Sequence, residues 1–390
     1  MAVFRREWTL PPVTSSTRST SGRQRPRMTS RLAIQQSVIL AALNLHASID
    51  ALMPIDVYRV VDGIKRPVPT PPVLVSPSSF GEGQPETIAE WLYQRRMALK
   101  GWGNFFGEIT ARDALGLPRQ IQPVPPEEVR MRISRWRIVE WYFGGVKMDP
   151  AKVWHERGAI LPGNPVGMNA IASSMMSAEV AAIAAEYLAD WFGNSATPGG
   201  ILRNRQKVLG DTQKAKVKAT YNSSVQNGDV FVTGADWEWV GTQAKAAESG
   251  FLEAMNVSDV QLCRFFDTPA NMIDVPVQGS ATINYANVTQ KNLDYLIMRK
   301  ASDLKRTDDM ITGRLLPRPQ YGKVNRAAFL AMDPASAADM MKVQIDARLR
   351  TPSELRMLDD HAPLTDADYA EFDRLFGSKN QTPAPKGLPA

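Results

Sequence analysis

The chain has 390 residues, of which 44% are hydrophobic and 22% charged, values typical of a globular protein with two or three packed substructures. Its single cysteine, Cys263, excludes an intramolecular disulfide framework, suits a reducing cytoplasm, and is interpreted as a small buried hydrophobe. Of the net charge of +6, residues 1–31 supply seven arginines against one glutamate, which leaves 39 basic and 39 acidic residues in the body. A formally neutral body argues against a domain that grips duplex DNA tightly.

Residues 1–31 are rich in Ser, Thr and Pro and contain little that could be buried. This composition predicts a disordered, arginine-rich tail, which either binds nucleic acid weakly or is a solvated extension. Residues 32–49 lack formal charge but include two Gln, two Ser, an Asn and a His, which makes them too polar for a membrane-spanning helix. We therefore expect neither a membrane span nor a signal peptide.

Region 32–166 is predicted to be one α+β unit. A helix is expected at 32–53, ended by Pro54, and then a strand at 55–61. After a proline-rich connection, a second helix is expected at 88–100, and short runs bounded by Gly and Pro predict strands between 104 and 160. Helical spacing predicts that the buried stripe of the first helix consists of Ile34, Val38, Ala41, Leu45, Ile49 and Leu52.

Residues 167–192 predict a long helix, about 39 Å at 1.5 Å per residue. The segment is rich in alanine, which allows neighbouring helices to approach closely, and it contains no Lys or Arg. Glu179, Glu186 and Asp190 are spaced by seven and four residues, which places them on one helical face. That face is either a solvated stripe or a negative surface turned toward something that must not bind.

Residues 197–242 predict a small α/β insertion between two helices. It would contain a strand from Gly199, a helix at 211–226 and a tight hairpin of 230–233 with 237–240. Basic residues gather between 203 and 218, where Asp211 is the single acid. They are Arg203, Arg205, Lys207, Lys214, Lys216 and Lys218. This basic stretch is either a docking surface or a solvated helix face.

A further helix is predicted from about residue 244 to 266, with Pro269 as its stop signal. Residues 270–287 are small and polar, with Asp274 as the single charge, and a long loop of this kind is either functional or disordered. A long charged helix is expected at 289–315. Near the C-terminus, Thr351-Pro352-Ser353-Glu354 and Thr365-Asp366-Ala367-Asp368 are typical helix starts, and 378–390 is a proline-containing tail.

The motifs of common enzyme classes are absent from the sequence. It has no phosphate loop ending in Gly-Lys-Ser/Thr, no Gly-x-Ser-x-Gly and no His-Glu-x-x-His. Its histidines, among them His155, which we interpret as a packed strand-end residue, are far apart, and no cysteine pair could hold zinc. The adjacent acids Asp308-Asp309 and Asp359-Asp360 point about 100° apart on a helix, so we interpret them as solvated faces. We expect no catalytic residue, cofactor or metal site.

Several motifs resemble, in the same order along the chain, those of the portal proteins of long-tailed bacteriophages. Residues 192–202, Phe-Gly-Asn-Ser-Ala-Thr-Pro-Gly-Gly-Ile-Leu, are the closest match, to a Phe-x-Asn-Gly-x-x-Pro-x-Gly-x-Leu run. Weaker matches lie at residues 37–59, 101–106, 162–167, 265–269 and 350–356. Together they cover most of residues 37–365.

The resemblance implies a mixed α/β portal fold that assembles as a ring, normally of twelve subunits, at one capsid vertex. The implied parts are the wing (32–166), first stem helix (167–196), clip (197–242), second stem helix (243–269), tunnel loop (270–287), wing return helix and strand (288–335) and helical crown (336–377).

The implied function is a channel through which double-stranded DNA is packaged and ejected, without sequence specificity. Implied partners are further copies of the chain, the large terminase subunit, the head–tail adaptor, the major capsid protein and a scaffolding protein. The implied location is the virion, after synthesis in the bacterial cytoplasm.

On this interpretation three groups of residues become candidate sites. The stem acids Glu179, Glu186 and Asp190 face the channel or the neighbouring stem. The tunnel-loop candidates are Asn271, Asp274, Gln278, Ser280 and Thr282. The candidates for a clip docking surface are Arg203, Arg205, Lys214, Lys216 and Lys218.

Two alternatives stay open. One is a different phage structural protein, an adaptor or capsid subunit, and assembly as a ring with a wide axial hole would separate a portal from a capsid subunit. The other is a nucleic-acid enzyme that uses the arginine-rich tail, although the sequence has no clustered carboxylates or histidines for such chemistry.

Overall fold

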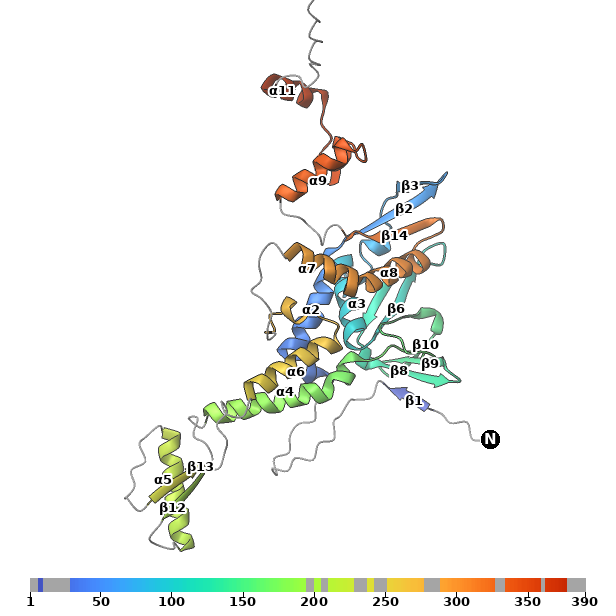
Figure 1. Ribbon diagram of the computed structural model, residues 1–390. Coiled ribbons are helices and arrows are strands. Elements are labelled where there is room, and N and C mark those ends of the chain that lie inside the picture. Colours follow the sequence, from blue (N-terminus) through green and yellow to red (C-terminus); the bar gives the residue numbers. More distant parts are fainter. Residues whose placement is uncertain are drawn as a thin grey trace, which may run out of the picture. The chain divides into compact units, whose positions relative to one another are not determined.

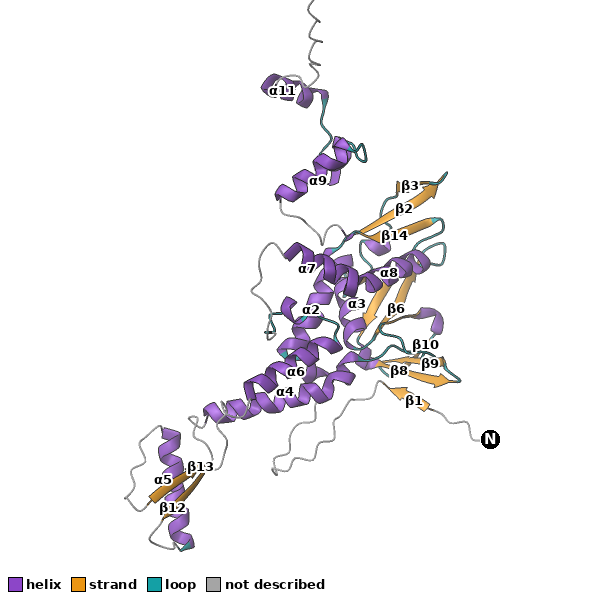
Figure 2. Cartoon of the chain, viewed as in Figure 1, coloured by secondary structure: helices purple, strands orange, loops and turns teal. Residues whose placement is uncertain are grey.

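The structure is a computed structural model that describes residues 6–9, 29–193, 200–204, 210–227, 237–241, 251–276, 288–326, 334–358 and 362–376. Helices and strands are mixed along the chain, as the sequence predicts (Figures 1 and 2). The chain divides into two compact units, Met1–Phe329 and Leu330–Ala390, which are described separately.

The helices of the first unit lie close to their predicted positions. They are α1 (Ser30–Ile34), α2 (Ser37–Leu52), α3 (Ile88–Gly101), α4 (Ala170–Gly193), α5 (Asp211–Asn227), α6 (Phe251–Phe265), α7 (Val288–Tyr295) and α8 (Ala301–Met310). Two π-helical segments, Leu296–Lys300 and Ile311–Leu315, follow α7 and α8, so helical backbone continues from residue 288 to residue 315. We call this continuous stretch the return helix.

Within the described residues, the strands form five small sheets in which every pairing is antiparallel. Their orders are β1-β8-β9-β10, β11-β6-β7, β14-β2-β3, β12-β13 and β4-β5. The bounds are β1 (Arg6–Thr9), β2 (Ile55–Val61), β3 (Ile64–Pro67), β4 (Ser78–Ser79), β5 (Pro85–Glu86), β6 (Asn104–Arg112), β7 (Pro118–Val124), β8 (Val129–Ser134), β9 (Arg137–Phe143), β10 (Val146–Met148), β11 (Val153–Arg157), β12 (Gly200–Asn204), β13 (Trp237–Gly241) and β14 (Gln320–Val324).

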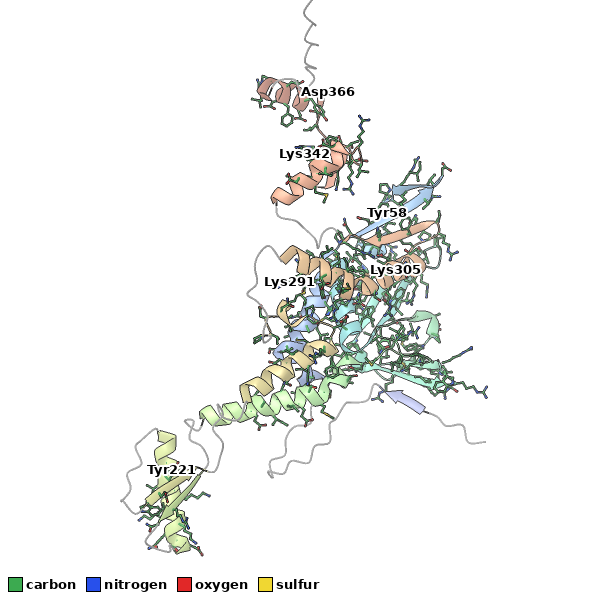
Figure 3. The ribbon with its side chains drawn as sticks, in the orientation of Figure 1. Tyr58, Tyr221, Lys291, Lys305, Lys342 and Asp366 are labelled. Carbon is green, nitrogen blue, oxygen red and sulfur yellow. The ribbon has the colours of Figure 1, made fainter. Side chains whose placement is uncertain are left out.

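Strand β14 brings the end of the first unit back to its beginning. It pairs with β2, so that Tyr321 lies opposite Tyr58, which Figure 3 labels, and the two rings stack 5.6 Å apart. Asp308 of α8 accepts a hydrogen bond from the Val324 amide at 2.8 Å and pairs with Arg326 at 3.0 Å. The expectation of a solvated face for Asp308 is therefore wrong, because its carboxylate accepts a backbone hydrogen bond from the strand that packs beside the helix.

Strand β6 has a buried face on each side. Phe105 packs on one side with Trp91 and Leu99 of α3, in a core that includes Ile311 of the return helix. Phe106 points to the other side, into a core formed mainly by β8 and β9. Since successive side chains of a strand point to opposite faces, these two adjacent phenylalanines join the helical layer to the second sheet.

A further core contains α1, α2, α4 and α6. It includes Leu43 of α2, Ile171 and Ala178 of α4, and Leu262 and Phe266 at the end of α6. Figure 1 shows α4 and α6 side by side, with α2 across one end of the pair. The α4–α6 pair extends outward from this core.

Three local predictions are corrected. Residues 6–9, expected to be disordered, form β1, because Trp8 and Thr9 favour strands and the edge of β8 offers free backbone groups. The single helix expected at 32–53 is two helices, since Gln36 has extended backbone. Strand β13 pairs with β12, whereas 230–233, its expected hairpin partner, lies outside the described residues.

The predicted apolar stripe of the first helix coincides only in part with its buried face. Of its members on α2, Ile49 is buried, but Leu52 is 60% exposed. The buried face of α2 consists instead of Ile39, Ala42, Leu43, His46, Ala47, Ile49 and Asp50. A rule that counts only apolar residues misses a face whose polar members find partners inside the protein.

The second unit contains α9 (Pro334–Asp346), α10 (Pro352–Leu358) and α11 (Asp366–Phe376). Both predicted helix starts are confirmed. The hydroxyl of Thr351 accepts from the Glu354 amide while Glu354 accepts from the Thr351 amide at 2.8 Å, and Thr365 and Asp368 repeat this reciprocal pattern.

The Gly103-Asn104 turn fixes the segment that leads into α4. The amide oxygen of Asn104 accepts from the Gly167 amide at 2.9 Å and from Nε2 of His155 at 3.0 Å. Gly103 has a left-handed φ of +73°, and a Cβ there would lie 2.0 Å from the carbonyl oxygen of Met168. The close approach of these two segments therefore requires glycine.

We predict that Gly103→Ala lowers the free energy of unfolding by about 3 kcal/mol or more, because left-handed strain adds to a backbone clash. Urea unfolding followed by tryptophan fluorescence measures this change. Gly81→Ala is the control, since its Cβ would meet nothing within 4 Å. Equal stability of the two variants would contradict the account.

Candidate functional site

Helices α4 and α6 pack through small side chains. Ala178 and Ala181 of α4 are buried, and Ser258 of α6 donates a hydrogen bond to the Ser177 carbonyl at 3.4 Å. Alanine and serine at such an interface allow the two backbones to approach closely, as the composition of the segment predicted. The pair is therefore a compact rod held at one end by α1 and α2.

The outward side of α4 carries acidic and apolar residues. Glu179 is half-buried and Glu186 is exposed, and their seven-residue spacing puts them on one face. Asp190 lies on the same helix, but its side chain is outside the described residues. On the neighbouring part of the surface, Met176 is 80% exposed and Val180 is 55% exposed. An apolar stripe next to acids is unusual for a solvated helix and is typical of a surface that a partner covers.

The tunnel-loop candidates are only partly described. Asn271 is exposed in the 3-10 turn Ala270–Met272, and Asp274 is exposed with a φ of +57°. Gln278, Ser280 and Thr282 lie outside the described residues. The structure thus shows how this segment begins, directly after α6.

The clip candidates do not form one patch in the part that is described. Lys214 and Lys218 are exposed and four residues apart on α5, so they share a face, whereas Lys216 points about 160° away. Arg203 is exposed on β12 opposite Glu238 of β13, and Arg205 is outside the described residues. Figure 3 shows Tyr221 on α5, where Tyr221 and Val217 are half-buried.

The most elaborate polar arrangement was not predicted from sequence. It is a buried charge network between α2, α3 and the return helix. The Asp50 carboxylate accepts from Nε of Arg96 at 2.5 Å and from Nζ of Lys300. Lys300 is fully buried and also donates to the His46 carbonyl at 3.0 Å. Arg96 pairs in addition with Asp303 at 3.1 Å, so one guanidinium connects two carboxylates on two helices.

Arg95 extends the network to strand β11. Its Nη2 donates to Glu156 at 2.6 Å and its Nη1 donates to the Thr307 hydroxyl at 3.2 Å. Glu156 also accepts from the indole nitrogen of Trp154 at 2.8 Å. Burial opposes the ionisation of Glu156, but Arg95 and these hydrogen bonds outweigh it and lower the pKa of the carboxyl.

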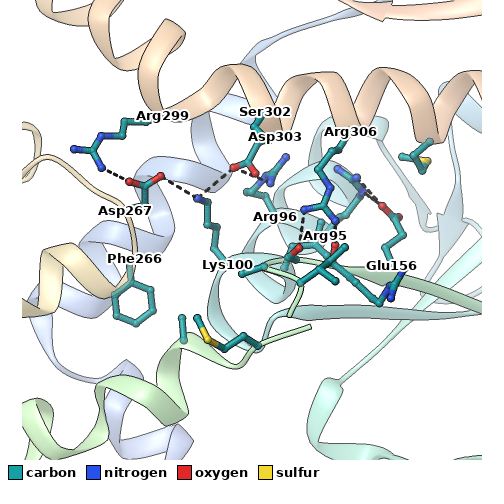
Figure 4. Close-up of a pocket in the computed structure, with 18 of the residues that line it drawn as sticks. Arg95, Arg96, Lys100, Glu156, Phe266, Asp267, Arg299, Ser302, Asp303 and Arg306 are labelled. Carbon is teal, nitrogen blue, oxygen red and sulfur yellow. Dashed lines mark hydrogen bonds and ion pairs between the residues drawn. The ribbon is translucent and has the colours of Figure 1, made fainter. Parts of the chain in front are cut away.

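The network reaches the end of α6 through Asp267 and His46. Asp267 pairs with Arg299 and lies 3.9 Å from Lys100, which itself pairs with Asp303 at 3.3 Å (Figure 4). The Phe266 carbonyl can only accept, so Nε2 of His46 carries a proton and donates to it at 3.0 Å. The other ring nitrogen then accepts from the Tyr295 hydroxyl at 2.9 Å.

The electrostatics of the network shift the pKa values of its buried groups. Burial, with Lys100 and Lys300 nearby, lowers the pKa of His46 well below its usual value, so its ring is neutral. Burial, reinforced by Arg96, lowers the pKa of Lys300 to about 8. Burial alone would raise the pKa of Asp303, yet Arg96, Lys100 and Lys300 hold it far below its usual range.

A cavity of about 700 Å³ lies beside the network, lined by Lys100, Glu156, Asp267, Asp303 and Arg306 among others (Figure 4). Its lining carboxylates Glu156, Asp267, Asp303 and Asp309 all have cationic partners. Within the described residues, no group of His, Cys, Asp and Glu could hold a metal ion. The arrangement is thus suited to holding helices together rather than to acid–base chemistry.

His155 occupies the predicted packed position. Its ring stacks on Phe106 at 4.9 Å and lies edge-on to Trp141 at 5.2 Å. Burial, with Arg157 nearby, lowers its pKa to about 4.

None of the helices within the described residues has the length and apolar composition of a membrane span.

Comparison with known proteins places this architecture in a class. A portal protein of the HK97 family from Corynebacterium diphtheriae shares the fold, with a TM-score of 0.58, 17% identity and coverage of 77% of this chain and 97% of that one. A chain from the neck of a native gene transfer agent particle, computed with C12 symmetry, has a TM-score of 0.54 and 17% identity over 84% of this chain and 91% of its own. The fold is that of ring-forming phage portals.

The chain belongs to the phage portal protein family, whose model matches residues 37–360. Among curated relatives, the portal protein of Enterobacteria phage HK97 is 24% identical over 351 residues, which is 86% of this chain and 81% of the relative. The resemblance predicted from the ordered motifs is therefore confirmed. Portal proteins are structural phage proteins with a DNA channel, so the family match favours this class over both alternatives raised by the sequence.

We predict that Asp50→Asn lowers the free energy of unfolding by about 3 kcal/mol or more, because Arg96 and Lys300 then face each other without the shared carboxylate. Adding Lys300→Met should recover part of this loss, since one unpaired buried charge is removed. Urea unfolding of the single and double variants measures the coupling.

The control is the exposed pair Lys305–Asp309, four residues apart on α8, whose members are 67% and 61% exposed. Removing both groups there should change stability by about 0.5 kcal/mol or less. Additive effects of Asp50→Asn and Lys300→Met would show that the buried groups are not coupled.

The two buried histidines predict a pH dependence. The folded pKa of His155, about 4, is below the ordinary value of 6.5, so only the unfolded chain gains a proton as the pH first falls below 6.5. Stability is complete above pH 6.5 and decreases below it, by about 2 kcal/mol at pH 5 for His155 alone. Urea unfolding at pH 7.5 and pH 5 should show a smaller difference in His155→Gln than in the wild type. An unchanged difference would contradict the assignment.

Proposed function

We propose that the chain assembles as a closed ring, normally of twelve copies, through which double-stranded DNA enters and leaves the phage head. The observation that carries this proposal is that the family match, residues 37–360, spans α4, α6 and the return helix. The twelvefold symmetry of the gene transfer agent neck supports the same copy number.

In this ring, α4 and α6 are the stem that surrounds the DNA. A channel wall must let duplex slide, so strong charge-assisted contacts to phosphates would slow its movement. Helix α4 contains no Lys or Arg and carries Glu179, Glu186 and Asp190, so we place these acids toward the channel or the neighbouring stem. The exposed Met176 and Val180 are then covered by the adjacent copy.

The residues after α6, 270–287, are the tunnel loop, which contacts DNA through small polar side chains. Its anchored end is held by the buried charge network, since Phe266, Asp267 and Thr268 bond to His46 and Arg299. A loop that touches moving DNA needs a rigid base, and the network supplies one by joining the end of α6 to α2 and the return helix.

The remaining parts follow the same assignment. Residues 32–166 with 288–335 form the wing, 197–242 the clip and 336–377 the crown. We assign the clip, with Arg203, Lys214 and Lys218, to the large terminase subunit during packaging and later to the head–tail adaptor. The major capsid protein, with a scaffolding protein during assembly, surrounds the ring in the virion, and the chain is made in the host cytoplasm.

The charge-reversal variant Glu179→Lys/Glu186→Lys/Asp190→Lys tests the stem assignment. We expect rings to form but DNA packaging to decrease about tenfold, because lysines would bind phosphates around the whole channel. The matched control is Glu82→Lys/Glu127→Lys/Asp346→Lys, which makes the same charge change at exposed positions on other elements. Packaged DNA per particle is the measurement, and equal packaging by both variants would refute the assignment.

A further inference from the structure

Three hairpins of the described residues have two-residue loops in which both residues adopt positive φ. Asp62-Gly63 connects β2 to β3, with φ of 53° and 77°, and Gly144-Gly145 connects β9 to β10, with φ of 54° and 85°. Arg135-Trp136 connects β8 to β9, with φ of 46° and 66°. All three loops therefore require positive φ at both positions, although their residues differ widely.

Such loops favour Asn-Gly, Asp-Gly or Gly-Gly, because a side chain at positive φ is strained. Two of the three loops follow this rule. The third holds Arg135 and Trp136, and bulky residues in this region are outliers whose strain points to a role outside folding. The fold itself thus gives no reason for this pair.

The side chains at this loop are presented to solvent. Trp136 is 80% exposed, and Arg135 and Arg137 beside it are exposed as well. Among the described residues, neither arginine has an ion pair that would neutralise it. An indole left in water between two free guanidinium groups has the composition of a binding hot spot, in which Trp and Arg are enriched.

The hairpin behind the loop is rigid and has one basic face. Its inner face is anchored in the core by Val129, Met131, Trp141 and Phe143. On the outer face Arg130 is exposed, while Glu140 bonds Arg132, Lys147 and the Tyr142 hydroxyl, each at 3.0 Å. The tip is therefore held firmly, as an anchor residue requires.

We propose that a surface of this hairpin, called the tip and made of Arg135, Trp136 and Arg137 at the loop with Arg130 five residues before it on β8, docks on an acidic protein surface. Trp136 would insert in an apolar depression and the arginines would pair with carboxylates around it. Duplex DNA is a poorer match, because its stacked bases offer the indole no pocket. This surface is on the β8–β9 hairpin and does not depend on the channel assigned to α4 and α6.

The test uses the full-length chain at physiological salt and three probes: poly-glutamate, an acidic glutamate–tyrosine copolymer and a short DNA duplex. The triple variant Arg130→Ser/Arg135→Ser/Arg137→Ser is compared with Arg59→Ser/Lys65→Ser/Arg66→Ser. The control residues are exposed cations on the β2–β3 hairpin, so the charge change and the strand context are matched. Fluorescence anisotropy of the labelled probes gives the affinities.

We expect the tip variant to bind both acidic polypeptides about tenfold more weakly and the control to stay within about twofold of the wild type. Trp136→Ala should weaken binding of the tyrosine-containing copolymer more than that of poly-glutamate. Equal affinities in the tip and control variants would overturn the proposal. A loss confined to the DNA duplex, or larger for it than for the polypeptides, would show a nucleic-acid surface instead.

A second variant separates docking from folding. Arg135→Asn/Trp136→Gly installs the preferred loop residues, so we expect the melting temperature to rise by about 2 to 4 °C while the affinity for the copolymer falls. Because this variant folds at least as well as the wild type, lost binding cannot come from unfolding. Retained affinity would show that the two loop residues do not take part in docking.

Discussion

The first unit depends on one electrostatic constraint, the sharing of Asp50 between Arg96 and Lys300. The three groups come from α2, α3 and the return helix, and Lys300 is fully buried. Removing Asp50 leaves two buried like charges facing each other, and removing Arg96 or Lys300 breaks an ion pair that joins two of the three helices. The shared carboxylate therefore fixes the mutual positions of the three helices. Asp303, Lys100 and Asp267 carry this constraint onward to the end of α6.

This constraint explains how a stem of small side chains can have a fixed position. The α4–α6 interface contributes alanines, which give close packing but little directional specificity. The directions of α4 and α6 are set at the end of the pair that lies in the core. There Asn104 bonds Gly167 just before α4, and His46 bonds Phe266 just after α6. Hydrogen bonds from buried polar groups therefore orient helices whose own surfaces could pack in several ways.

Much of the fold and the family could be predicted from sequence, because caps, prolines and helical spacing are local signals. The starts at Thr351 and Thr365 are such cases, and so is the ordered series of portal motifs. The charge network could not be predicted in this way. Its bonded members are up to 254 residues apart in the sequence. Asp50 looks like an ordinary polar residue near the end of an apolar helix until the fold places Lys300 against it. The available signal was His46 and Asp50 four residues apart on the apolar side of α2.

The candidate sites were predicted less completely than the fold. The sequence placed Glu179 and Glu186 on one helical face correctly, but it grouped Lys216 with Lys214 and Lys218 although a two-residue step on a helix points it away. The arginines of the β8–β9 hairpin were not singled out, because loop rules assign Arg-Trp no turn preference. Only its positive φ angles reveal that pair.

Electron microscopy of the purified chain, combined with a native mass measurement, tests the central claim most directly. The account predicts flat rings with an axial hole wide enough for duplex DNA and a mass corresponding to twelve copies of the 43.1 kDa chain. A monomer or dimer that forms no rings even at high concentration would contradict it.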